Sequence, residues 1–154
     1  MRPIMLKGEQ LICAPTDAQW WEWFCNFDNR IVARTNICCD YVISTVCLGI
    51  RTSRGAAFET LISGNKTEYI AERYSSVYAA RTEHNKIVER LFKERFEVND
   101  KTTLRTRVKN KSVMACWNGT MFEFWSDGIE GKFSNMDNML SGYFAVVQQL
   151  YQNK

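Results

Sequence analysis

A row of basic side chains at odd-numbered positions is the first feature of the sequence with the chemistry of a binding site. In an extended strand, alternate side chains point to one face and lie about 7 Å apart. The segment KTTLRTRVKNK would therefore present one basic row, made of Lys101, Arg105, Arg107, Lys109 and Lys111. Such a row could follow nucleic-acid phosphates, or it could be a solvated strand whose lysines discourage edge pairing. Arg51 and Arg54, in the glycine-bounded loop 49–57, would add to a phosphate or acidic-protein site.

His84 is the only histidine and is therefore the first candidate for a general base. It lies on the apolar stripe of a predicted helix and aligns with Tyr143 in an internal repeat, which favours a packed, hydrogen-bonded ring. Glu59 and Glu123 also occupy matching positions. A carboxylate pair is what glycoside hydrolysis requires, but a structural carboxylate that pairs with arginine or a backbone N–H is favoured. The sequence therefore predicts no catalytic residue.

The cysteines indicate buried free thiols, as in a reducing cytoplasm, with no metal and no cofactor. There are six, at positions 13, 25, 38, 39, 47 and 116, without a Cys-x-x-Cys pair. With one histidine in the chain, a zinc site would need an unusual ligand set. A nucleophile at Cys38-Cys39 would need a base within reach, and His84 is far along the chain.

The length and composition suit one compact domain or two small fused units, and one compact globule is expected. The chain has 154 residues, of which 45% are apolar and 24% charged, and no run of 18 apolar residues predicts a membrane span. The net charge is +3. Residues 1–100 carry 13 basic and 13 acidic groups, whereas residues 101–154 carry 7 and 4. The absence of a negative excess excludes an acidic mimic of nucleic acid. The positive excess is by itself too small to imply a nucleic-acid binder.

Hydrophobic periodicity and turn residues predict the elements that would position these side chains. The first half is expected to hold a hairpin at 3–13, a helix at 17–27 capped by Thr16 and Gln19, strands at 30–37, 41–50, 57–63 and 67–73, and a helix from Ser75 or Ser76 to about residue 95. The second half is expected to hold strands at 102–109, 112–117 and 120–126, with a type I′ turn at Asn118-Gly119, and a helix at about 136–151.

The two halves of the chain carry an internal repeat. Residues 73–91 align without a gap with residues 132–150, at an offset of 59. We therefore expect an α+β fold in which helices pack on one face of antiparallel sheet, built from two diverged β-β-α units. The predicted boundaries are 1–99 for the first unit and 100–154 for the second.

Several short blocks in the first half resemble a family of small proteins encoded by tailed bacteriophages. The blocks are WWEWFCN, RIVARTNI, VISTVCLGI, FETLISG and ERYSSVYAARTEHNKIVERL, within residues 18–92. The resemblance implies origin and compartment, namely the cytoplasm of an infected bacterium, rather than chemistry. Arg51-Thr52 stands where family members often carry Asp-His, so a histidine-based role for this loop is not expected here.

Three classes of function remain open at this point. The first is a non-enzymatic phage accessory or inhibitor protein that binds a host or bacterial-defence component, anti-CRISPR activity being one form of it. The second is a nucleic-acid or nucleotide-binding module that uses the basic strand at 101–111, and the third is an enzyme. The expected partner is a host or defence protein complex, with nucleic acid as the alternative and no membrane; the oligomeric state, a homodimer included, is left open.

Overall fold

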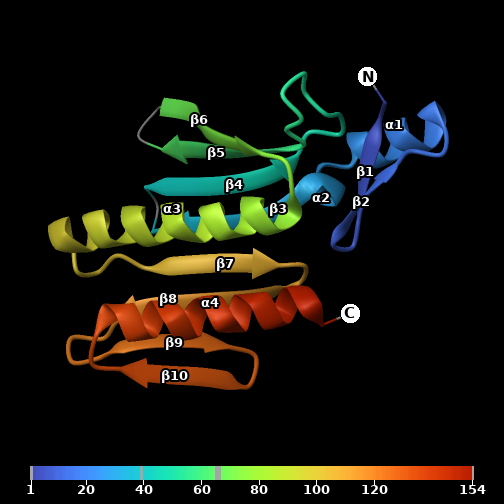
Figure 1. Ribbon diagram of the computed structural model, residues 1–154. Helices are drawn as coiled ribbons and strands as arrows, with labels where there is room; N and C mark the ends of the chain where they lie inside the picture. The colour runs from blue at the N-terminus through green and yellow to red at the C-terminus, as the bar shows by residue number, and fades with distance from the viewer. Residues whose placement is uncertain (1, 39, 65–66, 154) are drawn as a thin grey trace. The chain divides into compact units, whose positions relative to one another are not determined.

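The computed structural model describes residues 2–38, 40–64 and 67–153, and it confirms the α+β prediction, with an antiparallel sheet against which helices pack (Figure 1). The elements in chain order are β1 (Ile4–Lys7), β2 (Gln10–Cys13), α1 (Asp17–Cys25), α2 (Phe27–Arg30), β3 (Ile31–Ile37), β4 (Tyr41–Cys47), β5 (Phe58–Gly64), β6 (Thr67–Tyr74), α3 (Val77–Val98), β7 (Leu104–Val108), β8 (Lys111–Trp117), β9 (Phe122–Ser126), β10 (Ile129–Phe133) and α4 (Met136–Gln152).

The main sheet has the strand order β10-β9-β8-β7-β3-β4-β5-β6, and β1 and β2 form a separate hairpin. The chain divides into two compact units. Unit 1 comprises Met1–Ala33 and Ile43–His84, and unit 2 comprises Arg34–Val42 and Asn85–Lys154. The division passes through β3, β4 and α3, and each unit is described by itself below.

The N-terminal residues of unit 1 converge on the carbonyl of Gly49, which follows β4. This oxygen accepts the backbone N–H of Ile4 at 2.9 Å and the indole Nε1–H of Trp20 at 2.9 Å. Gly49 has a φ of 77°, and a Cβ at this position would lie 2.7 Å from the ring of Phe24. Only glycine is at ease with that backbone angle and that close contact.

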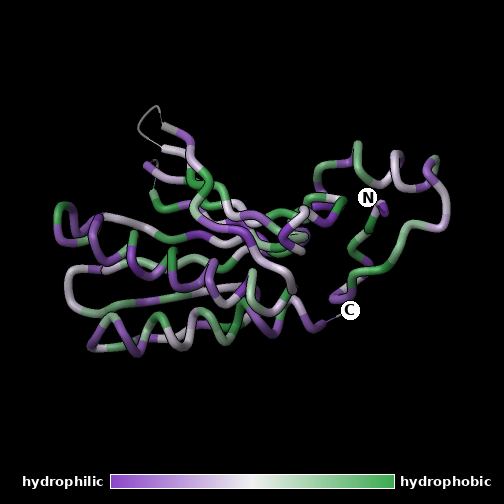
Figure 2. Tube along the Cα trace, turned by 45° about the horizontal axis from the view of Figure 1, so that its top comes forward, coloured by the Kyte–Doolittle hydropathy of each residue, from purple (hydrophilic) through white to green (hydrophobic). Residues whose placement is uncertain are grey.

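The core of unit 1 joins the N-terminal segments to the sheet and to the start of α3. It contains Ile4, Trp23, Val32, Cys47, Ala57, Phe58, Tyr74, Val77 and Ala80. Helix α3 begins after Ser76, whose hydroxyl accepts the N–H of Ala79. Figure 2 shows hydrophobic and hydrophilic residues alternating along the long helices, as expected of helices with one buried side.

Unit 2 packs one side of α4 against the strands β7 to β10. The buried residues of this helix are Met139, Leu140, Tyr143, Val146 and Val147, and Asn135 caps its first turn by accepting the N–H of Asn138. Strand β7 alternates between buried and exposed residues, so that Leu104, Thr106 and Val108 point to the core and Arg105 and Arg107 to solvent. Because the side chains alternate, the sheet face that does not contact α4 is exposed to solvent.

The hairpins β5–β6 and β9–β10 have matching registers. Phe58 pairs with Tyr74 in the first, and Phe122 pairs with Phe133 in the second. The next pair is Glu59 with Arg73 in one hairpin and Glu123 with Lys132 in the other. Both carboxylates form ion pairs with these partners, at 2.9 Å and 3.9 Å, which confirms the structural role expected for them.

Several predicted boundaries are wrong in detail. The first helix ends at Cys25, and a separate short helix begins at Phe27, because Asn26 leaves the helical region and accepts the N–H of Asp28. Asn118-Gly119 is not a type I′ turn. Strands β8 and β9 are joined by four residues, in which the Asn118 side chain accepts the N–H groups of Thr120 and Met121. A tight two-residue turn does occur at Asp127-Gly128, between β9 and β10.

Gly142 lets α4 approach the stacked rings of Phe124 and Phe133. A Cβ there would lie 2.8 Å from Phe124 and 3.1 Å from Phe133. Alanine favours a helix over glycine by about 1 kcal/mol, but overpacking a core costs about 1–3 kcal/mol. We therefore expect Gly142→Ala to lower the thermal unfolding midpoint, measured by circular dichroism. Ser141→Ala, on the exposed side, is the control and should leave the midpoint unchanged or raise it; an equal rise in both variants would contradict the packing.

Candidate binding face of unit 2

His84 is buried in unit 1 and does not reach solvent. Its exposed fraction is 1%, and its Nδ1 lies 2.9 Å from the hydroxyl of Thr45, which in turn lies 2.6 Å from the hydroxyl of Thr60. Burial lowers the pKa of His84 from 6.5 to about 3, so the ring is neutral at pH 7. The predicted packed, hydrogen-bonded histidine is confirmed.

Tyr143 makes the corresponding contacts in unit 2. Its hydroxyl donates to the hydroxyl of Thr106 at 2.6 Å and lies 3.1 Å from the carbonyl of Val113. The hydroxyl of Thr106 also lies 2.8 Å from the hydroxyl of Thr35. In each unit, therefore, two buried threonines on neighbouring strands contact each other, and one of them contacts the ring of a helix residue. Burial raises the pKa of Tyr143 above its ordinary value. Both rings therefore fix a helix to its sheet.

The open face of the unit 2 sheet gathers cationic and aromatic side chains, and we call it the arginine face. Its rows follow from the register, in which Asn36 pairs with Arg105, Arg105 with Met114, and Met114 with Trp125. Because Thr35 and Thr106 point to the core, the neighbouring positions point outward. The arginine face comprises Arg34, Asn36, Arg105, Arg107, Ser112, Met114 and Trp125. The same parity brings Cys116, Glu123, Glu130 and Lys132 to this side of the sheet, next to Trp125.

Among the described residues, the arginines of this face lack the carboxylate partners that some arginines elsewhere have. Arg73, Arg81 and Arg95 form ion pairs with Glu59, Glu9 and Asp40. Within residues 2–38, 40–64 and 67–153, by contrast, no carboxylate pairs with Arg34, Arg105 or Arg107, all of which are exposed.

The two β7 guanidinium groups contact only weak or local acceptors in the described part of the chain. Arg105 lies 3.4 Å from the hydroxyl of Ser112, and Arg107 donates to the carbonyl of Lys109 at 3.0 Å. Neither acceptor carries a charge, so the positive charge of both groups is available to an anion.

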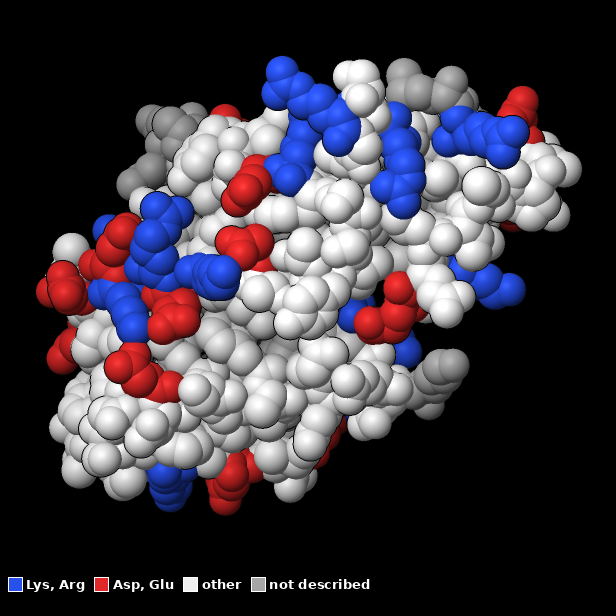
Figure 3. Space-filling view, in the orientation of Figure 1, with Lys and Arg blue, Asp and Glu red and all other residues white. Residues whose placement is uncertain are grey.

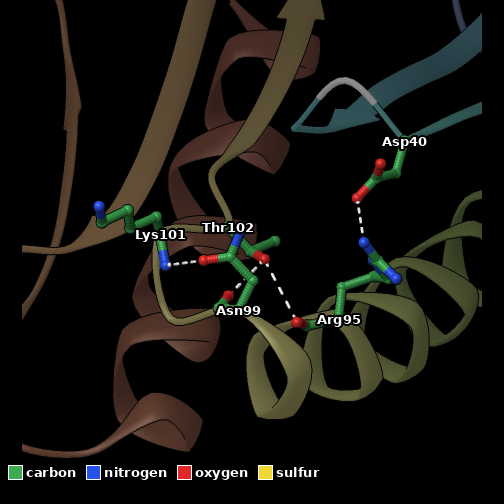
Figure 4. A network of polar contacts seen from close by, with 5 residues as sticks. All are labelled: Asp40, Arg95, Asn99, Lys101 and Thr102. Atoms are coloured by element: carbon green, nitrogen blue, oxygen red, sulfur yellow. Dashed lines mark hydrogen bonds and ion pairs between the residues drawn. The ribbon is translucent and has the colours of Figure 1, made fainter.

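The single row of five cations expected at 101–111 is wrong, because the extended segment is shorter than predicted. Only Arg105 and Arg107 lie on β7. Lys109 is in the turn after it with a φ of 56°, and Lys111 begins β8. Lys101 lies in the turn after α3, where its backbone N–H donates to Asn99 and its side chain points away from the helix end (Figure 4).

The polar network in Figure 4 fixes the start of β7. The hydroxyl of Thr102 donates to the carbonyl of Asn99 at 2.6 Å, and Arg95 forms an ion pair with Asp40 at 2.6 Å. The Thr102 hydroxyl also lies 3.4 Å from the carbonyl of Arg95 and so joins the end of α3 to the turn that leads into β7. The ion pair joins α3 to Asp40, the residue before β4.

The other two predicted site residues lie in unit 1. Arg51 donates to the carbonyl of Gly55 at 3.0 Å and thereby braces its own loop, while Arg54 is exposed in the same loop. The structure thus places Arg51 and Arg54 in a different unit from the arginine face.

Trp125 is a member of the arginine face that sequence reasoning missed. It is 38% exposed, and its chain neighbour Phe124 is buried on the opposite side of β9. The signal was present in the segment FEFWS, where Phe122 and Phe124 alternate with Glu123 and Trp125. When one face of a sheet is exposed to solvent, an aromatic residue that alternates with the buried residues of a strand points to that exposed face.

Charge is unevenly distributed on the helices of unit 2. Figure 3 shows basic and acidic side chains together over the C-terminal half of α3, and almost none over α4, whose only charged residue is Asp137. Lys93 joins the two helices by ion pairs to Glu89 and Asp137 at 2.8 Å and 2.7 Å. The charges of α3 are thus balanced locally, unlike those of the arginine face.

The described residues hold no cluster of histidine, cysteine and carboxylate side chains with metal-site geometry. The described free thiols are Cys13, Cys25, Cys38, Cys47 and Cys116, and the second member of the Cys38-Cys39 pair lies outside the described residues. The expectation of buried thiols holds for Cys47 but is wrong for Cys13, Cys25 and Cys38, which are exposed. None of the described helices combines the length and apolar character needed to cross a bilayer.

Comparison with known proteins gives no match to a protein-family model, to a curated protein or to a solved structure.

Proposed function

We propose that this protein is a non-enzymatic accessory protein that binds a component of a bacterial host or of its defence systems through the arginine face. The observation that carries the proposal is the set of exposed guanidinium groups at Arg34, Arg105 and Arg107, for which no described carboxylate provides a partner. Arginine, methionine and tryptophan are enriched at the centres of protein interfaces, and all three occur here.

The buried position of His84 supports a non-enzymatic role. A general base must come within hydrogen-bond reach of a substrate, and this ring is enclosed and bonded to Thr45. The phage origin and the site of action in the host cytoplasm rest on the family resemblance of residues 18–92. Inhibition of a CRISPR effector is one form that this function would take.

A nucleic-acid or nucleotide-binding function is the second candidate. The observation that favours it is the position of Trp125 on the same face as Arg105, two strands away. Exposed aromatic rings beside cations are the usual means of holding unpaired bases.

The proposal is tested by purifying the tagged protein from a bacterial host at low and moderate salt. The variant Arg105→Gln/Arg107→Gln should recover at least tenfold less of a stoichiometric partner than the wild type, because each charge-assisted contact contributes roughly 1.5–3 kcal/mol. The control Lys7→Gln/Arg90→Gln removes the same charge from exposed sites outside the face. Equal recovery of the partner by both variants would refute the assignment of the face, and circular dichroism should show both to be folded.

A further inference from the structure

Trp125 is an exposed indole on the arginine face. It lies on β9, where it pairs with Met114 of β8 on one side and with Glu130 of β10 on the other. The row continues from Met114 to Arg105 and then to Asn36. Neighbouring strands lie about 4.8 Å apart, so the backbones at Trp125 and Arg105 are about 10 Å apart.

The cations of the arginine face lie to one side of this indole. Arg105 and Arg107 alternate along β7, which places them about 7 Å apart. Two residues before Trp125 on β9, the carboxylate of Glu123 lies 2.8 Å from the amide of Asn118 and 3.9 Å from Lys132. Glu130 is the acidic residue directly beside the ring. A ligand that touches both Trp125 and β7 therefore needs an aromatic group at one end and negative charge at the other.

Single-stranded nucleic acid has this chemistry. Each nucleotide offers a flat base that can stack on an aromatic side chain and a phosphate that can meet a guanidinium group. A duplex keeps its bases stacked inside and could offer only phosphates to this face. An acidic protein surface would satisfy the arginines but has no general reason to require the indole.

We propose that the arginine face binds single-stranded nucleic acid, with one base stacked on Trp125 and backbone phosphates at Arg105 and Arg107. This inference rests on the second candidate function, since both use the same face, and it names the kind of nucleic acid that is bound. Met114 lies between the ring and the cations and provides an apolar surface beneath the sugar.

The test measures the binding of a fluorescently labelled oligothymidylate or oligouridylate by anisotropy, at about 50 mM and about 200 mM salt. Trp125→Ala should weaken binding roughly tenfold, and Trp125→Phe should retain most of the affinity because its ring still stacks. Neither change should alter the salt dependence. Arg105→Gln/Arg107→Gln should reduce the slope of log affinity against log salt by about 1.4, that is about 0.7 for each phosphate that the variant no longer neutralises.

The possible outcomes separate this inference from the proposed function. If Trp125→Ala binds as well as the wild type while the arginine variant does not, the face attracts polyanions without stacking and the inference fails. Equal affinity for single strands and for a duplex of the same length would also overturn it. If the wild type binds no oligonucleotide but retains a protein partner that the arginine variant loses, the inference fails and the proposed function stands.

Discussion

Replacing Tyr143 with alanine is expected to lower the free energy of unfolding of unit 2 by about 3–5 kcal/mol, the range for loss of a buried aromatic side chain. The ring is 0% exposed and is among the largest fully buried side chains. Its removal would also leave the carbonyl of Val113 and the hydroxyl of Thr106 without the phenol that now contacts them. Since whole domains are stable by only about 5–15 kcal/mol, this single change would remove a large part of that stability.

Tyr143→Phe is the matched variant, because it keeps the ring and removes only the hydroxyl. It should cost about 1–2 kcal/mol, which corresponds to the lost hydrogen bond and an unsatisfied acceptor. Urea unfolding followed by circular dichroism measures both variants. If alanine costs no more than phenylalanine, the ring does not fill the core as described.

Acid is expected to weaken the fold through His84. Its pKa is about 3 in the folded protein, against 6.5 for an unperturbed histidine. Between these values the unfolded chain binds a proton that the folded protein excludes, so stability decreases as the pH falls from about 6.5 toward 3. The loss is about 1.4 kcal/mol per pH unit, or about 5 kcal/mol over the whole range.

His84→Phe isolates this contribution, since phenylalanine has no proton to bind. The wild type and the variant are compared by urea unfolding at a series of pH values between 7 and 4. The difference in their free energies of unfolding should change steeply with pH, whatever the variant's stability at pH 7. A constant difference would show that the histidine is not held neutral by burial.

The fold could be predicted because its elements carry strong local signals. The spacing of Met139, Tyr143 and Val146 predicted α4, and the alternation of Leu104, Thr106 and Val108 predicted β7. Turn geometry was less predictable. Asn118-Gly119 is compatible with a type I′ turn, but the hydrogen bonds of the Asn118 side chain support a four-residue loop instead. Local propensity does not reveal which of two compatible turns the flanking strands select.

The arginine face was predictable only in part. Parity along one strand identified Arg105 and Arg107, but it could not show that Asn36, Met114 and Trp125 lie in the same row. That row depends on pairing between strands distant in sequence, which periodicity within one strand does not encode. The row of five cations also needs the strand to continue to residue 111, whereas the chain reverses at Lys109-Asn110 and Lys111 begins β8.

The carbonyl of Gly49 gives the N-terminal part of unit 1 a common anchor. Hairpin β1–β2 and helix α1 each attach to this one oxygen, through Ile4 and Trp20. Their docking is therefore coupled: a turn of this peptide plane would release both attachments at once. A substitution at position 49 would therefore disturb the attachment of both the hairpin and helix α1, and not of one of them alone.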